Sequence, residues 1–214
     1  FISVINYSLI CAQDEQEWDY NDGIIRLIDT SKTWNVLVQQ QYYRTKCYKF
    51  EGDTIVQNKK YSKLYYSYSE NFDKEKSVYC CGIRDDGGEM YIRYPFEIEY
   101  LLYDFNVKLC DTLNMGMVNR AAPLLVQVEY VDTVEMLGKT RKIIHLIPLD
   151  RSSSVPQTWI QGIGSTLGLV ETAHAQYFMY NTALLCYKEK DSLIWQNENW
   201  ACYFSTAPED RSLI

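Results

Sequence analysis

The dipeptide Asp86-Gly87 lies between two strand-forming segments, and this arrangement restricts the surrounding chain to a β-hairpin. The two segments are Val78–Arg84 and Glu89–Tyr94. Asp-Gly suits the positive φ angles of a two-residue type I′ turn, because glycine carries no Cβ. With Asp86-Gly87 as the loop, Arg84 would face Glu89, which is a favourable cross-strand pair.

Similar segments recur along the chain between short polar turns. Nineteen tyrosines and five tryptophans, together with valine, isoleucine and threonine, favour strands. Further hairpin turns are predicted at Gln57–Lys60 and Leu137-Gly138. We therefore predict one all-β domain over residues 13–204, followed by a tail at 205–214. About eleven to thirteen antiparallel strands would form a β-sandwich or a flattened barrel.

The end of the domain reads as a three-stranded meander with turns at Glu189-Lys190 and Asn197-Glu198. In that register Trp195 faces Trp200, and both tryptophans share an apolar face with Leu193. A face of this kind belongs to the core, so we expect Trp195 and Trp200 to be structural.

The same register separates Cys186 from Cys202 by two strand spacings, roughly 9–10 Å, which is too far for a disulfide. Adjacent Cys80 and Cys81 should point to opposite faces of their strand. A chain of 214 residues does not need a disulfide framework to fold. We expect mostly reduced, buried cysteines.

A glycine-dense run, Thr158–Leu169, contains Gly162, Gly164 and Gly168. Glycine permits positive φ and lets a large side chain or another backbone come close. One hypothesis is a phosphate-binding loop, but the helix and acidic residue of a dinucleotide-binding unit do not follow this run. The other, which we favour, is a structural crossover with Trp159 as a packing anchor.

The first 12 residues are largely apolar, and residues 13–17 turn abruptly acidic. This change resembles the end of a secretory signal peptide cleaved after Ala12, although an ordinary N-terminal strand is the alternative. We expect residues 1–12 to be a signal-peptide remnant and the protein to be secreted, periplasmic or on the outer cell surface. No segment reaches the roughly 20 apolar residues of a transmembrane helix.

The formal net charge of -7 and the pI near 4.9 argue against a nucleic-acid partner. The seven cysteines match no zinc-binding spacing, and the acidic residues near Asp86 lack the alternation of a calcium loop. We expect neither a metal nor a cofactor.

Few residues could carry catalysis or ligand binding. His145 lies in an apolar strand, so His174, with Glu171 nearby, is the candidate for acid–base chemistry. Trp159, His174, Tyr177 and Tyr180 could line a cleft for a glycan or an apolar ligand, because flat rings stack on such groups. The competing interpretation is that these rings fill the interior of the sandwich.

Four short motifs occur within about residues 33–204: Trp159–Ser165 with Gly168-Leu169, the Gly82–Gly87 hairpin, Leu102–Asn106 followed by Asp111-Thr112, and Leu184–Tyr187. Together they resemble a family of secreted and cell-surface proteins of unknown function from Bacteroidota. Similar proteins often carry a separate C-terminal sorting domain for export. This chain has Leu109-Cys110 where the family pattern has Val-Gly. The resemblance implies export and transfers no functional residue.

Three functions remain open from the sequence. The first is a secreted or surface-exposed, non-enzymatic binding or structural module, whose partner would be a glycan, an apolar small molecule or a protein. The second is a carrier of a glycan or small apolar ligand in an aromatic-lined cavity. The third is a hydrolase that uses His174 and carboxylates.

Overall fold

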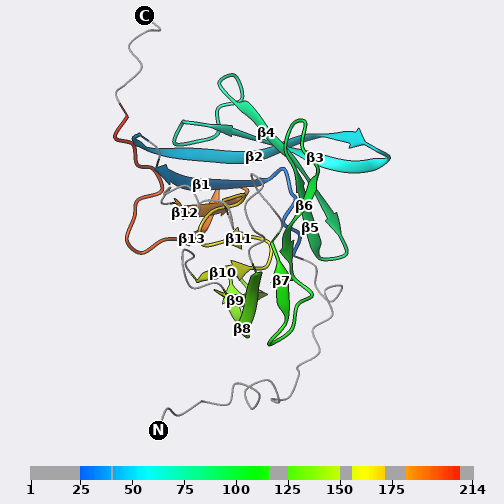
Figure 1. The fold of residues 1–214 in the computed structure, drawn as a ribbon. Helices are drawn as coiled ribbons and strands as arrows, with labels where there is room; N and C mark the ends of the chain where they lie inside the picture. The colour runs from blue at the N-terminus through cyan, green and yellow to red at the C-terminus, as the bar shows by residue number, and fades with distance from the viewer. Residues whose placement is uncertain (1–24, 40, 116–124, 150–155, 172–181, 208–214) are drawn as a thin grey trace, which may run out of the picture.

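The structure of the protein is a computed structural model that describes residues 25–39, 41–115, 125–149, 156–171 and 182–207. These residues form thirteen β-strands and no helix, and the strands make two antiparallel sheets (Figure 1). The predicted all-β sandwich is thereby confirmed. The predicted signal-peptide remnant, residues 1–12, lies outside the described residues.

The larger sheet contains eight strands in the order β13-β12-β1-β2-β3-β4-β5-β6. It curves strongly, so that β4 to β6 cross the direction of β1 and β2 (Figure 1). Its strands are β1 (Lys32–Gln39), β2 (Tyr43–Val56), β3 (Lys59–Ser67), β4 (Val78–Asp86), β5 (Glu89–Arg93), β6 (Glu99–Asp104), β12 (Thr182–Glu189) and β13 (Ser192–Gln196).

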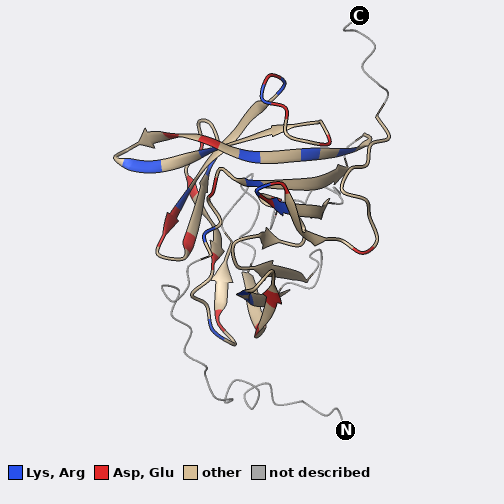
Figure 2. Ribbon diagram, turned by 180° about the vertical axis from the view of Figure 1, so that it is seen from behind, with Lys and Arg blue, Asp and Glu red and all other residues tan. Residues whose placement is uncertain are grey.

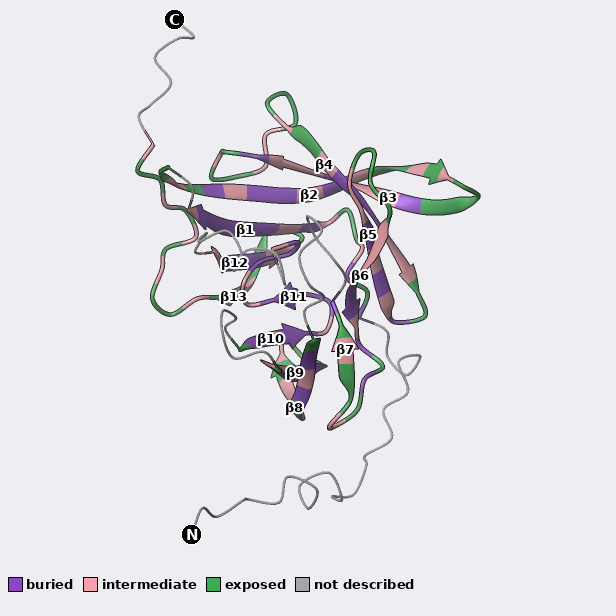
Figure 3. Cartoon of the chain, in the orientation of Figure 1, coloured by how far each residue is buried: buried purple, intermediate pink, exposed green. Residues whose placement is uncertain are grey.

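The smaller sheet contains five strands in the order β11-β10-β9-β8-β7. Its strands are β7 (Thr112–Asn114), β8 (Leu125–Met136), β9 (Lys139–Pro148), β10 (Gln157–Ile160) and β11 (Gly164–Ser165). The hydrophobic core takes residues from both sheets, and Figure 3 shows buried stretches in each of them. We call the face of the larger sheet that carries Trp34, Tyr48 and Phe50 its inner face.

Four two-residue turns with positive φ at both positions close the hairpins, as the right-handed twist of paired strands requires. They are Gln57-Asn58, Gly87-Gly88, Leu137-Gly138 and Lys190-Asp191. The predicted turn at Leu137-Gly138 is confirmed, and the turn predicted within Gln57–Lys60 occupies Gln57-Asn58.

Two turn predictions need correction. The loop of the β4–β5 hairpin is Gly87-Gly88 rather than Asp86-Gly87, so Arg84 pairs with Tyr91 and not with Glu89. Two glycines satisfy the positive φ angles at both turn positions, which leaves Asp86 as the last residue of its strand. The turn predicted at Glu189-Lys190 likewise lies one residue later, at Lys190-Asp191.

The predicted third strand of the C-terminal meander is absent from the described residues. Trp195 pairs with Tyr187 in β12. Trp200 lies in an irregular segment and is not the strand partner of Trp195. We call residues 197–207 the C-terminal strap, because they lie against the outer face of β1 and β2. Thr45 binds both backbone groups of Phe204, and the backbone of Ser205 bridges to Arg44. A strand in the meander would have left this outer face uncovered.

The strap also corrects the cysteine prediction. Cys186 and Cys202 form a disulfide with a Cα–Cα distance of 5.2 Å. A bulge at Asn35/Val36 places Cys186 opposite Asn35, on the outer face, and the strap brings Cys202 over it. Cys110 is also disulfide-bonded, whereas Cys47, Cys80 and Cys81 are free.

A second bulge overturns the expectation that Cys80 and Cys81 point to opposite faces. Leu64 pairs with Cys81 and Tyr65 pairs with Tyr79, so Cys80 is the extra residue. The bulge breaks the alternation of side chains. As a result Cys80 packs against the inner core to which Cys81 belongs.

Candidate functional site

The glycine-dense run forms the β10–β11 hairpin and the turn that follows it. Gly162, Gly164 and Gly168 all have positive φ, of 74°, 104° and 134°. A Cβ on Gly162 would lie 2.4 Å from a side-chain carbon of Ile25, and one on Gly164 would lie 2.9 Å from the hydroxyl of Tyr103. The run is therefore shaped by groups that approach its backbone from distant parts of the chain.

Trp159 lies in the core beneath this run. Its side chain is fully buried, in edge contact with Tyr103 at a centroid distance of 5.2 Å. The Tyr103 hydroxyl donates to the carbonyl of Leu169 at 2.7 Å and accepts from the amide of Ser165 at 3.0 Å. Because the Trp159 side chain is fully buried, neither face of its ring is open for stacking on a ligand.

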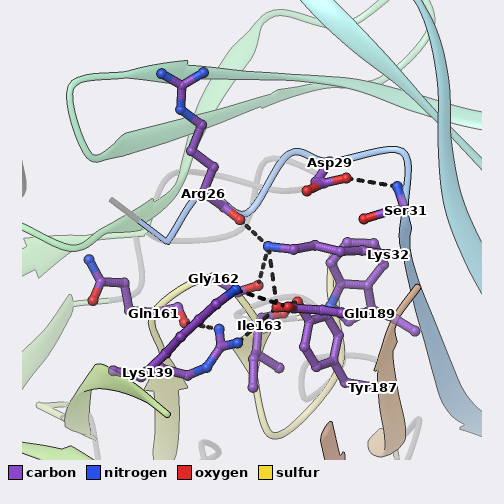
Figure 4. A network of polar contacts seen from close by, with 12 residues as sticks. Arg26, Asp29, Ser31, Lys32, Lys139, Gln161, Gly162, Ile163, Tyr187 and Glu189 are labelled. Atoms are coloured by element: carbon purple, nitrogen blue, oxygen red, sulfur yellow. Dashed lines mark hydrogen bonds and ion pairs between the residues drawn. The ribbon is translucent and has the colours of Figure 1, made fainter. Parts of the chain in front are cut away.

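A group of charges, buried except for Lys139, joins the two sheets near the glycine run. We call it the Glu189 cluster: Lys32, Lys139, Arg141, Tyr187 and Glu189 (Figure 4). The Glu189 carboxylate accepts hydrogen bonds from Tyr187 at 2.6 Å and from Arg141 at 2.8 Å. Lys139 lies 3.2 Å from the other carboxylate oxygen. Lys32, almost fully buried, also donates to the carbonyl of Arg26.

The electrostatics of this cluster follow from burial and from an excess of cations. Burial lowers the pKa of Lys32 to about 8, although the Glu189 charge partly offsets this. Burial raises the pKa of Glu189, but the hydrogen bonds from Tyr187, Arg141 and Lys139 outweigh it and hold that pKa at about 2. Arg141 Nε is the one buried side-chain nitrogen or oxygen without a hydrogen-bond partner in the described part of the chain. The cluster is a tightly paired structural contact between the sheets.

A different group of side chains is partly open to solvent at one end of the inner face. We call it the tyrosine patch: Arg44, Lys46, Tyr66, Tyr68 and Glu171. Arg44 and Lys46 belong to the series of basic residues spaced along β2 (Figure 2). Lys46 Nζ lies 4.5 Å from the ring centroid of Tyr66, and the Arg44 guanidinium lies 5.2 Å from that of Tyr68.

The rings of the patch are in contact with each other and with the core. Tyr66 packs against Tyr68 with a centroid distance of 5.4 Å and against the buried Tyr48 at 5.8 Å. Tyr68 is 43% exposed, whereas Tyr66 is half-buried. Burial raises the pKa of Tyr66 to about 12, and the neighbouring Tyr68 adds to this. The Tyr66 hydroxyl, with its pKa raised in this way, is therefore a neutral hydrogen-bonding group at physiological pH.

Glu171 brings a carboxylate to this end of the sandwich. The Tyr48 hydroxyl donates to Glu171 Oε1 at 2.5 Å, and the amide of Val170 donates to Oε2 at 3.1 Å. A Cβ on Gly168 would lie 2.5 Å from Glu171 Oε2. The third glycine of the run is therefore what allows the Glu171 carboxylate to fold back onto Tyr48.

The sequence-predicted site is only partly visible. His174, Tyr177 and Tyr180 lie outside the described residues, in the segment that begins directly after Glu171. Trp159 is fully buried in the core and therefore does not contribute to the partly exposed tyrosine patch. His145 lies on the smaller sheet, stacked on Tyr130 at a centroid distance of 3.7 Å and 3.0 Å from the hydroxyl of Thr158.

Sequence reasoning missed Arg44, Lys46, Tyr66 and Tyr68. The spacing of Arg44, Lys46 and Tyr48, two positions apart in one strand, does indicate that these three side chains share a face. It does not reveal that Tyr66 of the next strand and Tyr68 just beyond that strand lie beside them, because that depends on the register of the β2–β3 hairpin.

No protein-family model, curated protein or solved structure matches this chain. Among the described residues, no helix is both long and apolar enough to cross a membrane. The same residues contain no group of three or more histidine, cysteine, aspartate or glutamate side chains placed to hold a metal ion.

Proposed function

We propose that this chain is a secreted or surface-exposed, non-enzymatic binding module, and that the tyrosine patch is part of its binding surface. The observation that carries this proposal is the partly exposed pair Tyr66 and Tyr68, flanked by Lys46, Arg44 and the carboxylate of Glu171. Ring faces beside charged donors and acceptors suit a ligand with a flat apolar face and many hydroxyl groups. A glycan is the class that fits.

An apolar ligand suits the patch less well. It would cover the Lys46 ammonium without offering it a hydrogen bond, and burying an unpaired charge is costly. A glycan offers hydroxyl acceptors to Lys46 and hydroxyl donors to the Glu171 carboxylate. In the sequence, Glu171 is followed directly by the segment that holds His174, Tyr177 and Tyr180, the residues that the sequence proposes for the same role.

The cysteines support the proposed location. Disulfides form and persist in oxidising compartments, and the Cys186–Cys202 disulfide ties the C-terminal strap to strand β12. Export is also what the resemblance to secreted Bacteroidota proteins implies.

Polysaccharide binding tests the proposal directly. Affinity gel electrophoresis with soluble neutral and acidic polysaccharides should retard the wild-type chain. Tyr68→Ala should weaken this binding about two- to tenfold, because one stacked ring is worth about 0.5–1.5 kcal/mol. Tyr79→Ala is the matched control, since Tyr79 is similarly exposed, at 37%, but packs with Tyr65 away from the patch.

Two results would count against the proposal. One is binding that Tyr79→Ala and Tyr68→Ala weaken equally. The other is a chain that no polysaccharide retards and that forms a discrete complex with a second protein in native mass spectrometry, which would make the patch a protein interface.

A further inference from the structure

Arg44 and Lys46 supply the positive charge of the tyrosine patch. Each lies over a ring of its own: Lys46 Nζ is 4.5 Å from the centroid of Tyr66, and the Arg44 guanidinium is 5.2 Å from that of Tyr68. No carboxylate of the described residues lies within ion-pairing distance of either cation. Their charges are therefore balanced only by ring faces, which leaves them able to bind an anionic group of a ligand.

The two cations repeat along one strand. They stand two positions apart in β2, so their side chains leave the same face of the sheet about 6.6–6.8 Å apart. Tyr66 and Tyr68 have the same spacing in the chain, and the patch thus holds two ring–cation pairs side by side. A repeat of this kind fits a polymer with several anionic groups better than a ligand with one.

The one carboxylate of the patch is already hydrogen-bonded within the protein. Glu171 accepts from the Tyr48 hydroxyl at 2.5 Å and from the amide of Val170 at 3.1 Å. Two cations against one carboxylate leave the patch positive, although the whole chain carries a formal net charge of -7. Salt screens exposed charges beyond about 8 Å at physiological ionic strength. The charges of the patch itself therefore decide which ligand binds there.

We propose that the tyrosine patch recognises acidic glycans, that is, polysaccharides that carry carboxylate or sulfate groups. The Arg44 guanidinium is a planar fork that can donate two parallel hydrogen bonds to one anionic group, and the Lys46 ammonium adds a compact charge. The exposed ring of Tyr68 contacts the sugar itself. This inference rests on the proposed glycan-binding function and adds the chemical class of the glycan.

The test compares acidic polysaccharides with neutral forms of the same backbone, by affinity gel electrophoresis of the whole chain. The pairs are polygalacturonate and its methyl ester, hyaluronan and its methyl ester, and dextran sulfate and dextran. We expect the acidic member of at least one pair to bind the wild-type chain about fivefold or more tightly than its neutral form. The carboxylate pairs and the sulfate pair show separately which anion the patch prefers.

Charge-removing variants assign this preference to the patch. Lys46→Gln should weaken binding to the acidic form about three- to tenfold, because it removes a charge that complements the ligand. It should change binding to the neutral form by less than about twofold, since the glutamine amide still donates hydrogen bonds. Arg44→Gln, at an exposed position, should show the same selective loss.

Lys49→Gln is the matched control. Lys49 belongs to the same strand and also lies over a ring, with its Nζ 5.8 Å from the centroid of Phe72. Three positions separate it from Lys46, so it projects from the opposite face of the sheet. Lys49→Gln should bind the acidic and neutral forms as the wild type does.

Failure of this inference can be told apart from failure of the proposed function. Equal binding of the acidic and neutral forms, with Tyr68→Ala weakening both, would overturn the preference for acidic glycans and leave the proposed function standing. An equal loss in Lys46→Gln and Lys49→Gln would also overturn the inference, since it would indicate general attraction to a polyanion. A chain that none of these polysaccharides retards would overturn both.

Discussion

The indole nitrogen of Trp34 donates a hydrogen bond to the carbonyl oxygen of Ile163 at 2.7 Å. Trp34 belongs to the central strand β1 of the larger sheet, and Ile163 lies in the β10–β11 turn of the smaller one. Both residues are fully buried. A polar contact between the sheets therefore fixes how far the smaller sheet can slide along the larger.

Trp34→Phe keeps an aromatic ring in this position but removes the donor. It leaves the Ile163 carbonyl unsatisfied in the core, which costs about 1–3 kcal/mol, and the smaller ring adds a packing loss. We expect the free energy of unfolding in urea to fall by about 2–4 kcal/mol. Trp200→Phe, at a half-buried position, should lower it by less than about 1 kcal/mol. Equal losses would show that Trp34 acts by ring size alone.

Comparing Gly164→Ala with Gly138→Ala separates two costs in stability, that of a steric clash with a neighbouring group and that of backbone strain. Both glycines have positive φ, but a Cβ on Gly164 would meet the Tyr103 hydroxyl at 2.9 Å, whereas nothing lies within 4 Å of one on Gly138. We expect Gly138→Ala to cost about 1–2 kcal/mol for the left-handed backbone. Gly164→Ala should cost about 1–3 kcal/mol more, because it displaces a hydroxyl that holds Ser165 and Leu169. Thermal unfolding measures both, and a smaller loss for Gly164→Ala would contradict this account.

Glu189 should make the protein sensitive to acid. Its pKa in the folded state is about 2, below the ordinary 4.5, so its contribution to stability is complete above pH 4.5 and is lost as the pH falls toward 2. Glu189→Gln leaves Lys32 and Arg141 buried without their carboxylate. We expect it to lower stability at pH 7 by about 3 kcal/mol and to flatten the pH dependence between 4.5 and 2. Glu135→Gln, at an exposed position, should leave both unchanged. An unaltered acid slope in Glu189→Gln would contradict the assignment.

The C-terminal strap should control access to Cys47. This thiol is buried on the outer face beside Asn35, whose amide donates to the carbonyls of Cys202 and Glu70. Burial raises the Cys47 pKa to about 12, so almost no thiolate is present at pH 8. In Cys202→Ser we expect alkylation of Cys47 to become at least about tenfold faster, because the untied strap opens locally. Cys81 is the internal control, since the strap does not cover it. Faster labelling of both would indicate general unfolding.

The sequence predicts the class of fold but not the details that depend on contacts between distant residues. The turn at Leu137-Gly138 is found as expected, because a single dipeptide there meets the φ requirement. Within residues 85–88, two overlapping dipeptides meet the φ requirement, Asp86-Gly87 and Gly87-Gly88. Composition alone does not determine which of them forms the turn.

The bulges were the larger source of error. One extra residue reverses the facing of every side chain beyond it, and this is how Cys186 reached the outer face and how Cys80 joined Cys81. Bulges depend on the partner strand, so the strand's own sequence does not reveal them. The tyrosine patch escaped prediction for the same reason, since its rings come from a strand whose register is set elsewhere.

Strands β1 and β12 are hydrogen-bonded neighbours in the larger sheet, although Lys32 and its partner Glu189 stand at nearly opposite ends of the chain. Six strands, from β1 to β6, can pair in the order in which they are made. The edge of β1 that pairs with β12 stays unpaired until almost the whole remaining chain has been made. A chain threaded across a membrane from its N-terminus would therefore emerge with this edge open, and the sandwich would close only as the last strands appear.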